Sequence, residues 1–295
     1  QFGSELSRFP SFAAARQMIN YPYHLARLEG RITRDIYRAA LPLITRRIIK
    51  PPRKIDIDVF AYSGEQTLPE QVASIRSFLR YAGRPNRFTV VSDGSYAPQS
   101  IKLIETIDQV VKVAPATPVS PHLPETIRAY LTNHPMGKQL AVIMSLPADR
   151  PALYIDSDVL FFPSASDLAD RAAARGFPAC YLADCHFAGD ERLIRDPLEE
   201  KDPVNAGCIL LHRKLDWNLG LERLLQLKGS PNFFTTQTIV HLTMHLNGAG
   251  PLDPRKYVLQ VDDQFGYRDF YAGKSLAMRH YVNPVRHKFW TYFAR

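Results

Sequence analysis

The stretch that decides the fold is ALYIDSDVLFF, residues 152–162, an apolar run interrupted only by Asp156, Ser157 and Asp158. A short apolar run of this kind is typical of a strand buried in a parallel sheet. Residues two apart in a strand point to the same side, so the two carboxylates share one face, and a dry core does not tolerate them without a countercharge. The stretch therefore predicts a buried strand whose end carries two acids into a cleft.

Strand and helix patterns alternate around this stretch. Before it, strands are expected at 55–64, 87–95 and 110–114, and helices at 68–83, 98–108 and 135–147. After it, strands are expected at 180–184, 205–213 and 256–261, and helices at 216–228 and 233–248. This alternation predicts an α/β fold with a mostly parallel sheet flanked by helices and a binding crevice outside the strand C-termini. No internal repeat divides residues 55–295, which we treat as a single domain.

The net charge of +8 is concentrated at the N-terminal end. Residues 1–54 contain 11 Lys and Arg against 3 Asp and Glu, whereas residues 55–295 contain 26 against 26. A neutral body lacks the basic face of a nucleic-acid-binding domain, so no nucleic-acid partner is expected. No apolar run approaches the roughly 20 residues that span a bilayer. We expect a soluble, cytoplasmic protein in which Cys180, Cys185 and Cys208 are reduced thiols.

Residues 1–54 form a separate segment that contains a basic amphipathic helix. Its apolar positions recur at helical spacing, at Leu25, Leu28, Ile32 and Ile36. A parallel stripe of arginines follows another face, at Arg27, Arg31, Arg34 and Arg38. The helix is expected to end near Pro42. Two interpretations stay open: packing on the domain with a solvated arginine face, or docking of residues 25–54 on an anionic membrane surface as a peripheral protein.

Asp156 and Asp158 have the chemistry of a divalent metal site. Carboxylate oxygens are hard ligands that suit Mn²⁺ or Mg²⁺. Mg²⁺ usually keeps waters and completes its shell with substrate phosphates. We therefore expect Mn²⁺ or Mg²⁺ as the cofactor and a bound diphosphate as the third partner.

Tyr154-Ile155-Asp156-Ser157-Asp158, followed by apolar residues, resembles the D-x-D motif of GT-A nucleotide-sugar glycosyltransferases. The strand VFAYSG resembles the first strand of that fold, whose end, here Tyr62 and Ser63, touches the nucleobase. Asp93 in VVSDGS resembles the acid after the second strand that contacts uridine or ribose. Lys138 resembles a basic residue found before the D-x-D strand. The resemblance covers roughly residues 55–290 in motif order and implies a GT-A fold and a nucleotide-sugar donor, with a UDP-sugar favoured.

Downstream motifs resemble those of the glycogenin-like, galactosyltransferase-type retaining enzymes. Val204-Asn205-Ala206-Gly207 resembles their N-x-G segment, and Gln237 is the only residue of Thr236-Gln237-Thr238 that matches their acid-Gln-acid motif. The segment from His280 to Trp290 resembles their C-terminal His-x-x-Gly-x-x-Lys-Pro-Trp motif, with Asn283 for Gly, Arg286 for Lys and a later Trp. By this resemblance His280 is the third metal ligand, and Arg286 or Lys288 contacts the diphosphate.

The resemblance implies that the enzyme transfers a sugar, with a hexose favoured. The acceptor would be a glycan, a lipid-linked sugar or a small molecule. Gln237, Asn205 and Asp184 are the candidate catalytic residues. An inverting enzyme needs a carboxylate base near the acceptor hydroxyl. Gln237 in place of a carboxylate favours retention, whereas Asp184, Asp262 and Asp263 leave inversion open.

Two other functions compete with sugar transfer. A Mg²⁺-dependent phosphatase of the haloacid dehalogenase type also uses a D-x-D at a strand end, and Asp262 and Asp263 would then complete its metal site. The motif of that class is normally followed by Gly-Thr and lies early in its domain, unlike the Val159-Leu160 found here. The third possibility is a membrane-peripheral binding protein with a decayed nucleotide pocket, which Thr236 and Thr238 would support.

Overall fold

The computed structural model describes residues 20–174 and 176–291, so residues 1–19 of the N-terminal segment lie outside the described part. Its centre is a seven-stranded sheet with the order β3-β2-β1-β4-β7-β6-β8. The strands are β1 (Asp58–Ser63), β2 (Arg87–Ser92), β3 (Val111–Ala114), β4 (Ala152–Asp156), β6 (Ala179–Ala183), β7 (Val204–Leu211) and β8 (Gly250–Pro251). β1 pairs in parallel with β2 and β4, β2 with β3, and β6 with β8, whereas β7 runs antiparallel to β4 and β6. The expected mostly parallel α/β sheet is confirmed.

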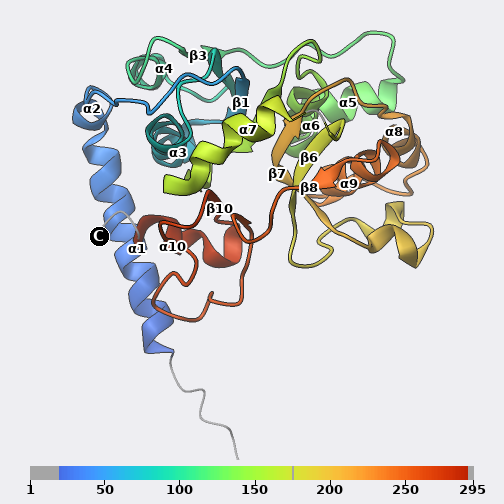
Figure 1. The fold of residues 1–295 in the computed structure, drawn as a ribbon. Coiled ribbons are helices and arrows are strands. Elements are labelled where there is room, and N and C mark those ends of the chain that lie inside the picture. The colour runs from blue at the N-terminus through green and yellow to red at the C-terminus, as the bar shows by residue number, and fades with distance from the viewer. Residues whose placement is uncertain (1–19, 175, 292–295) are drawn as a thin grey trace, which may run out of the picture.

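Helices cover both faces of this sheet (Figure 1). One hydrophobic core lies under α3 (Leu68–Tyr81), α4 (Pro98–Glu105) and α7 (Leu168–Ala173). The other lies under α5 (Glu125–Asn133), α6 (Pro135–Met144), α8 (Asn218–Leu225) and α9 (Thr235–Leu246). Alternate residues of β4 point to the two cores, with Leu153 and Ile155 in the first and Ala152 and Tyr154 in the second. Burial on both faces explains why this strand is apolar from Ala152 to Ile155.

The stretch 152–162 is two strands and not the single strand that its composition suggests. β4 ends at Asp156, and β5 (Val159–Phe161) belongs to a second sheet with the order β5-β10-β9. In that sheet β5 pairs with β10 (Met278–His280), and β10 also pairs with β9 (Tyr257–Val258). Both acids therefore lie at the break between the two sheets, where the chain leaves one and enters the other.

The N-terminal helix packs on the domain through a face that the sequence does not suggest. α1 (Tyr21–Ala39) and α2 (Leu41–Ile44) stand at one edge of the molecule, and α1 lies beside α10 (Arg286–Thr291) (Figure 1). The buried residues of α1 are Ala26 and Gly30, and a Cβ at Gly30 would lie 2.5 Å from the carbonyl oxygen of His287. Small residues thus allow the two helices to approach closely. The large apolar residues Leu25, Leu28, Ile32 and Ile36 remain 50% to 64% exposed.

Candidate functional site

Two acids and a histidine meet at the break between the sheets. Asp156 is the last residue of β4, Asp158 precedes β5, and His280 is the last residue of β10. β5 and β10 pair antiparallel with Val159 opposite His280, and this register brings the imidazole to the acids. His280 Nε2 lies 3.0 Å from Asp158 Oδ1 and 3.6 Å from Asp156 Oδ2. The three residues that the sequence predicts as metal ligands therefore form one cluster.

Each acid is oriented by its own partners. Asp156 Oδ1 accepts hydrogen bonds from Tyr154 Oη at 2.8 Å and from Gln139 Nε2 at 2.7 Å. These bonds leave Asp156 Oδ2 directed toward His280. Asp158 Oδ2 accepts a hydrogen bond from Arg286 Nη2 at 2.5 Å, and Oδ1 is directed toward His280. The sequence analysis did not identify Gln139 and Tyr154 as site residues. The sequence offers only their positions: Tyr154 is two residues before Asp156 in β4, and Gln139 is in the helix that precedes this strand.

His280 is held by the Asn205 motif. Asn205 Oδ1 lies 3.0 Å from His280 Nδ1 and also accepts the backbone N–H of Gly207 at 2.9 Å. Because an amide oxygen only accepts, it keeps the proton on Nδ1 and leaves Nε2 free to act as a ligand when the ring is neutral. A Cβ at Gly207 would lie 2.2 Å from His280 Cε1, so a glycine is needed to make room for the ring. The N-x-G segment is thus the support of the histidine.

Charge in this cluster is shared between the three groups. Burial lowers the pKa of His280, but the carboxylates of Asp158 and Asp156 outweigh burial and raise it. Burial raises the pKa of Asp156. Burial acts in the same direction on Asp158, but His280 and Arg286 outweigh it and hold the pKa of Asp158 well below its ordinary value. Asp158 is therefore an anion that His280 and Arg286 already neutralise, and a metal ion bound here would have to take the place of the proton on His280.

The donor set fits a divalent metal ion. One ligand atom from each of Asp156, Asp158 and His280 lies within 4.8 Å of the other two. Carboxylate ligands favour Mg²⁺ and Mn²⁺, whereas an imidazole ligand favours transition metals. A set of two carboxylates and one imidazole can therefore bind a divalent transition metal as well as Mg²⁺.

The cluster forms one wall of a cavity of about 600 Å³ at the carboxyl end of β4. All three candidate catalytic residues, Gln237, Asn205 and Asp184, also line this cavity. Gln237 Oε1 accepts the backbone N–H of Ala206 at 3.0 Å, and Gln237 Nε2 donates to the carbonyl of Val204. Gln237 therefore clamps the backbone that carries Asn205. The volume lies within the usual range for small-molecule sites.

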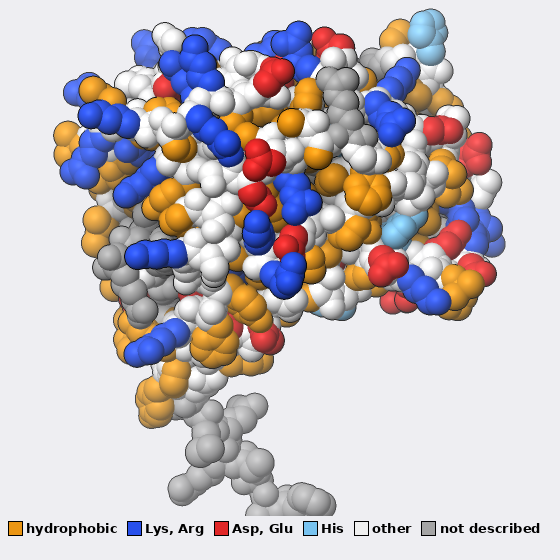
Figure 2. All heavy atoms as spheres, in the orientation of Figure 1, with side chains coloured by type: hydrophobic (Ala, Val, Ile, Leu, Met, Phe, Trp, Pro, Cys, Tyr) orange, Lys and Arg blue, Asp and Glu red, His pale blue; other side chains and the backbone are white. Residues whose placement is uncertain are grey.

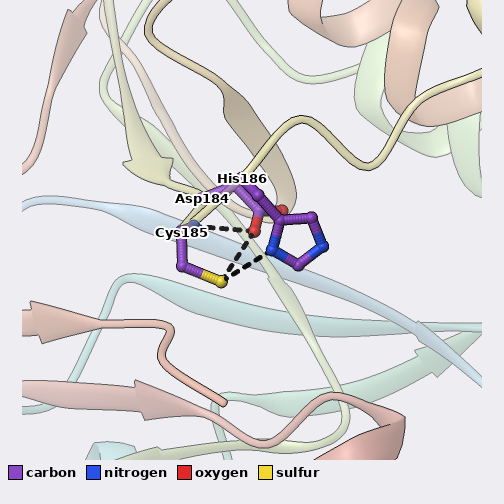
Figure 3. A group of neighbouring side chains, drawn as sticks. All are labelled: Asp184, Cys185 and His186. Atoms are coloured by element: carbon purple, nitrogen blue, oxygen red, sulfur yellow. Dashed lines mark hydrogen bonds between the residues drawn. The ribbon is translucent and has the colours of Figure 1, made fainter. Parts of the chain in front are cut away.

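Asp184, Cys185 and His186 form a second group of potential metal ligands in the described chain (Figure 3). They are consecutive residues of one loop, and the Cys185 thiol lies 3.2 Å from His186 Nδ1. Burial and the neighbouring Asp184 carboxylate raise the pKa of Cys185 to about 11, so the thiol stays protonated. Asp184 Oδ2 also accepts a hydrogen bond from Asn205 Nδ2 at 2.9 Å. Asp184 and His186 both line the main cavity, so this group belongs to its wall.

The predicted nucleobase contacts lie at the ends of β1 and β2. Tyr62 is half-buried and pairs in register with Asp156 across β1 and β4. Ser63 is buried, and its hydroxyl is bonded to Gln71 and Tyr96. Asp93 accepts two hydrogen bonds from Ser95, as the acid of a tight turn does. A Cβ at Gly64 would lie 2.1 Å from the Asp93 carboxylate, so the two strand ends touch here.

The predicted basic contacts divide into three different environments. Arg286 lines the main cavity and is 48% exposed. Lys288, the other expected diphosphate contact, is fully buried and does not face the cavity. Its ammonium group donates to the backbone carbonyls of Gly266 and Arg268 and lies 3.6 Å from Asp263. The half-buried Lys138 lies on α6 beside Gln139 and is absent from the described walls of the main cavity.

A smaller cavity of about 390 Å³ lies on the other side of Asp158 and Arg286, and helix α1 forms one of its walls. Arg34 of α1 pairs with Glu70 at 2.5 Å and donates to the carbonyl of Gln66. Arg38 donates to the carbonyl of Glu65 at 3.1 Å, and no described carboxylate pairs with it. The sequence treats these arginines as a surface stripe, but two of them reach the site. The lining residues are Arg34, Arg38, Gln66, Thr67, Glu70, Ser157, Asp158 and Arg286.

Comparisons with known proteins connect this architecture to glycosyltransferases. No protein-family model and no curated protein matches the sequence. The fold is similar to a galactosyltransferase, LgtC, solved with donor and acceptor sugar analogs, with a TM-score of 0.53 and 15% identity over 77% of this chain and 87% of that one. It is also similar to the glycosyltransferase GlyE of Streptococcus pneumoniae, with a TM-score of 0.52 and 15% identity over 81% of this chain and 60% of that one.

A third similar structure is mouse xyloside xylosyltransferase 1, with a TM-score of 0.50 and 12% identity over 79% of this chain and 99% of that one. At these identities the likeness shows the fold alone. The chain therefore has the GT-A glycosyltransferase fold that the D-x-D segment predicts.

Proposed function

We propose that the protein is a metal-dependent glycosyltransferase that moves a hexose from a UDP-sugar to an acceptor hydroxyl. The observation that carries the proposal is the cluster of Asp156, Asp158 and His280 at the edge of a cavity in a GT-A fold. Two acids and a histidine from three separate strand ends converge there, and structural packing alone gives no reason for a buried acid pair. The cavity offers the donor a cation site on one wall and polar groups on the others.

The residues of the chain have distinct proposed roles. Asp156, Asp158 and His280 hold Mn²⁺ or Mg²⁺, which supplies neutralisation of the charge that develops on the departing nucleoside diphosphate. Arg286 is close enough to the acid pair to contact the same phosphates. Asn205 and Gln237 fix the position of His280 and of the strand that faces the sugar. Tyr62, Ser63 and Asp93 contact the nucleoside, and Lys138 reaches the diphosphate through a rearrangement of its side chain.

Retention of anomeric configuration is supported by the carboxylates in the main cavity. Apart from the two metal-binding acids, Asp184 is the one carboxylate in the described lining, and Asn205 already hydrogen-bonds to it. Asp263 is buried in ion pairs with Arg279 and Lys288, and Asp262 accepts a hydrogen bond from Tyr271. Neither acid lines the main cavity, which disfavours both as a general base for inversion and as the extra metal ligand of a phosphatase. The acceptor is a glycan, because the exposed Phe233 and Phe234 rings at the cavity edge offer apolar platforms to a sugar.

Ligand-induced stabilisation tests the donor site. We expect Mn²⁺ and UDP together to raise the melting temperature by about 5 °C or more, and either alone to do much less, because the diphosphate completes the metal shell. Asp158→Asn should abolish the joint effect, while Asp262→Asn should keep it. A stabilisation by a fluoroaluminate phosphate mimic without any response to UDP and Mn²⁺ would instead support a phosphatase. Indifference to all of these ligands would support a binding protein.

We also propose that α1 docks the protein on an anionic membrane surface. Tyr21, Leu25, Leu28, Ile32 and Ile36 form an apolar face between 50% and 72% exposed. The 11 Lys and Arg of residues 1–54 outnumber the 3 Asp and Glu. Hydrophobic and basic side chains lie side by side along the edge of the molecule that α1 and α2 form (Figures 1 and 2). None of the described helices is long and apolar enough to cross a bilayer.

Co-sedimentation with vesicles tests this docking. We expect binding to vesicles that contain phosphatidylglycerol and little binding to pure phosphatidylcholine vesicles, because both the apolar face and the positive charge contribute. Ile32→Glu should remove binding by placing a charge in the apolar face. Leu198→Glu is the matched control, since Leu198 is 62% exposed and lies outside the N-terminal segment. Equal loss in both variants, or no binding of the unaltered protein at low salt, would contradict the docking.

A further inference from the structure

A large apolar groove lies outside the proposed catalytic site, between the N-terminal helices and the core. Its volume is about 750 Å³. α1 and α2 form one side, α3 forms the other, and Leu160 and Phe161 of β5 contribute from the strand that follows Asp158. The lining residues are Thr33, Ile36, Tyr37, Ala40, Ile44, Arg47, Ile49, Ala73, Arg76, Ser77, Arg80, Tyr81, Leu160 and Phe161.

Three arginines line this groove, and none of them pairs with an acid in the described part of the chain. Arg47, Arg76 and Arg80 form no ion pair with any carboxylate of residues 20–174 and 176–291. Arg76 donates to the backbone carbonyl of Arg47 at 3.0 Å, and the Arg80 guanidinium lies 5.2 Å from the centre of the Tyr81 ring. Burial lowers the pKa of Arg76, and the charges of Arg47 and Arg80 lower it further. Like charges gathered around an apolar space indicate a site for an anion.

The groove also opens onto the exposed apolar face of α1. Ile36 belongs to both, because it lines the groove and is 64% exposed. Leu43 and Ile48 are neighbours in sequence of residues that line the groove, and they are 68% and 88% exposed. The groove therefore adjoins the surface that we propose to face a membrane, and a lipid in that membrane could enter it. This continuity and the arginines together require a ligand with an apolar body and an anionic head.

We propose that the groove between α1, α2 and α3 binds one anionic phospholipid, with an acyl chain along the apolar walls and the phosphate at Arg47, Arg76 and Arg80. Arginine suits phosphate because its planar guanidinium donates two parallel hydrogen bonds. The volume matches the usual size of a small-molecule site. This site is separate from the proposed donor cavity, so lipid binding here would be a function distinct from sugar transfer. It also differs from adsorption to a charged surface, because a single lipid molecule would occupy the groove.

A soluble short-chain lipid tests the groove without a membrane. We would measure thermal stabilisation of the full chain by dihexanoyl phosphatidic acid, below its micelle concentration, and compare it with dihexanoyl phosphatidylcholine and with inorganic phosphate. The anionic lipid should stabilise the protein most. Ala40→Phe, which fills the groove from its edge, should remove the effect. Exchanging both Arg47 and Arg80 for Gln should weaken binding by about 25-fold, because each basic residue contributes about a fivefold factor at an anionic surface.

A charge-matched double variant separates the groove from general electrostatics. Arg31→Gln with Arg46→Gln removes the same charge from exposed positions of residues 1–54 that do not line the groove. This control should bind the anionic lipid as the unaltered protein does. Equal stabilisation by inorganic phosphate, equal binding of the zwitterionic lipid, or equal loss in the control would each overturn the proposal. Because the assay contains neither nucleotide nor vesicle, its failure is distinguishable from failure of the donor site or of membrane docking.

Discussion

Replacing Gly207 by alanine tests whether the N-x-G segment supports a metal site through His280. The added Cβ would lie 2.2 Å from His280 Cε1, 2.6 Å from Nδ1 and 2.9 Å from Asn205 Oδ1. Ordinary carbon contacts are about 3.5–4.0 Å, so the ring must retreat by about 1 Å or more. Metal–ligand distances tolerate deviations of only about 0.2 Å. The imidazole therefore leaves the position from which Nε2 can share a cation with Asp156 and Asp158.

Loss of support around a ligand typically costs 10–100-fold in metal affinity. Because the alanine displaces the ligand itself, we expect the upper end, about 100-fold or about 2.7 kcal/mol. The assay is titration of Mn²⁺ into the purified protein, followed by calorimetry and by the electron paramagnetic resonance of free Mn²⁺. Gly273→Ala is the matched control, because its nearest neighbour is 3.9 Å from the new Cβ. A folded Gly207→Ala protein with unchanged Mn²⁺ affinity would refute the assignment of His280 as a ligand.

Three further predictions concern the surroundings of the site. Arg286→Gln should weaken binding of UDP with Mn²⁺ by about tenfold in calorimetry, because we propose that this guanidinium contacts the phosphates and a hydrogen bond to a charged group contributes about 1.5 kcal/mol or more, and Arg31→Gln should not. Gly30→Ala should lower stability by about 1–3 kcal/mol in urea unfolding, because the new Cβ meets the backbone of α10 at 2.5 Å. Burial raises the pKa of Asp190, but hydrogen bonds, chiefly from Arg192, outweigh burial and lower this pKa in the folded protein. The ionised acid therefore stabilises the fold fully above its unfolded pKa of about 3.9. This stabilisation is lost as the pH falls through the lower pKa of the folded state. Asp190→Asn should therefore destabilise at neutral pH and flatten the acid limb of a stability–pH profile.

Local patterns in the sequence account for the sheet and for the acid pair, and the resemblance to GT-A motifs accounts for His280. The alternation of strands and helices specifies the mostly parallel sheet, because the central strands are rich in apolar residues that are buried on both faces. The break after Asp156 could not be predicted, since an apolar run reads the same whether it continues one strand or passes into a second sheet. That break, with the pairing of Val159 and His280, is what brings a distant histidine to the acids.

The errors arise where packing decides between similar residues. Arg286 and Lys288 are two apart in a helix, so they point about 200° apart, and only one can face the cavity. Lys288 is the residue that points inward, toward Asp263. In α1 the expected packing face was the large apolar one, but Gly30 permits a closer approach to α10 than leucine or isoleucine does. The arginine stripe is consequently rotated toward the body, where Arg34 meets Glu70.

The central claim is tested most directly by release of nucleoside diphosphate from a panel of donors that includes UDP-glucose, UDP-galactose and UDP-xylose, with and without Mn²⁺. We predict release of UDP from at least one UDP-hexose that requires Mn²⁺, is abolished by chelation, and is lost in Asp158→Asn but kept in Asp262→Asn. Release that is independent of the metal, or that persists unchanged in Asp158→Asn, would contradict the account.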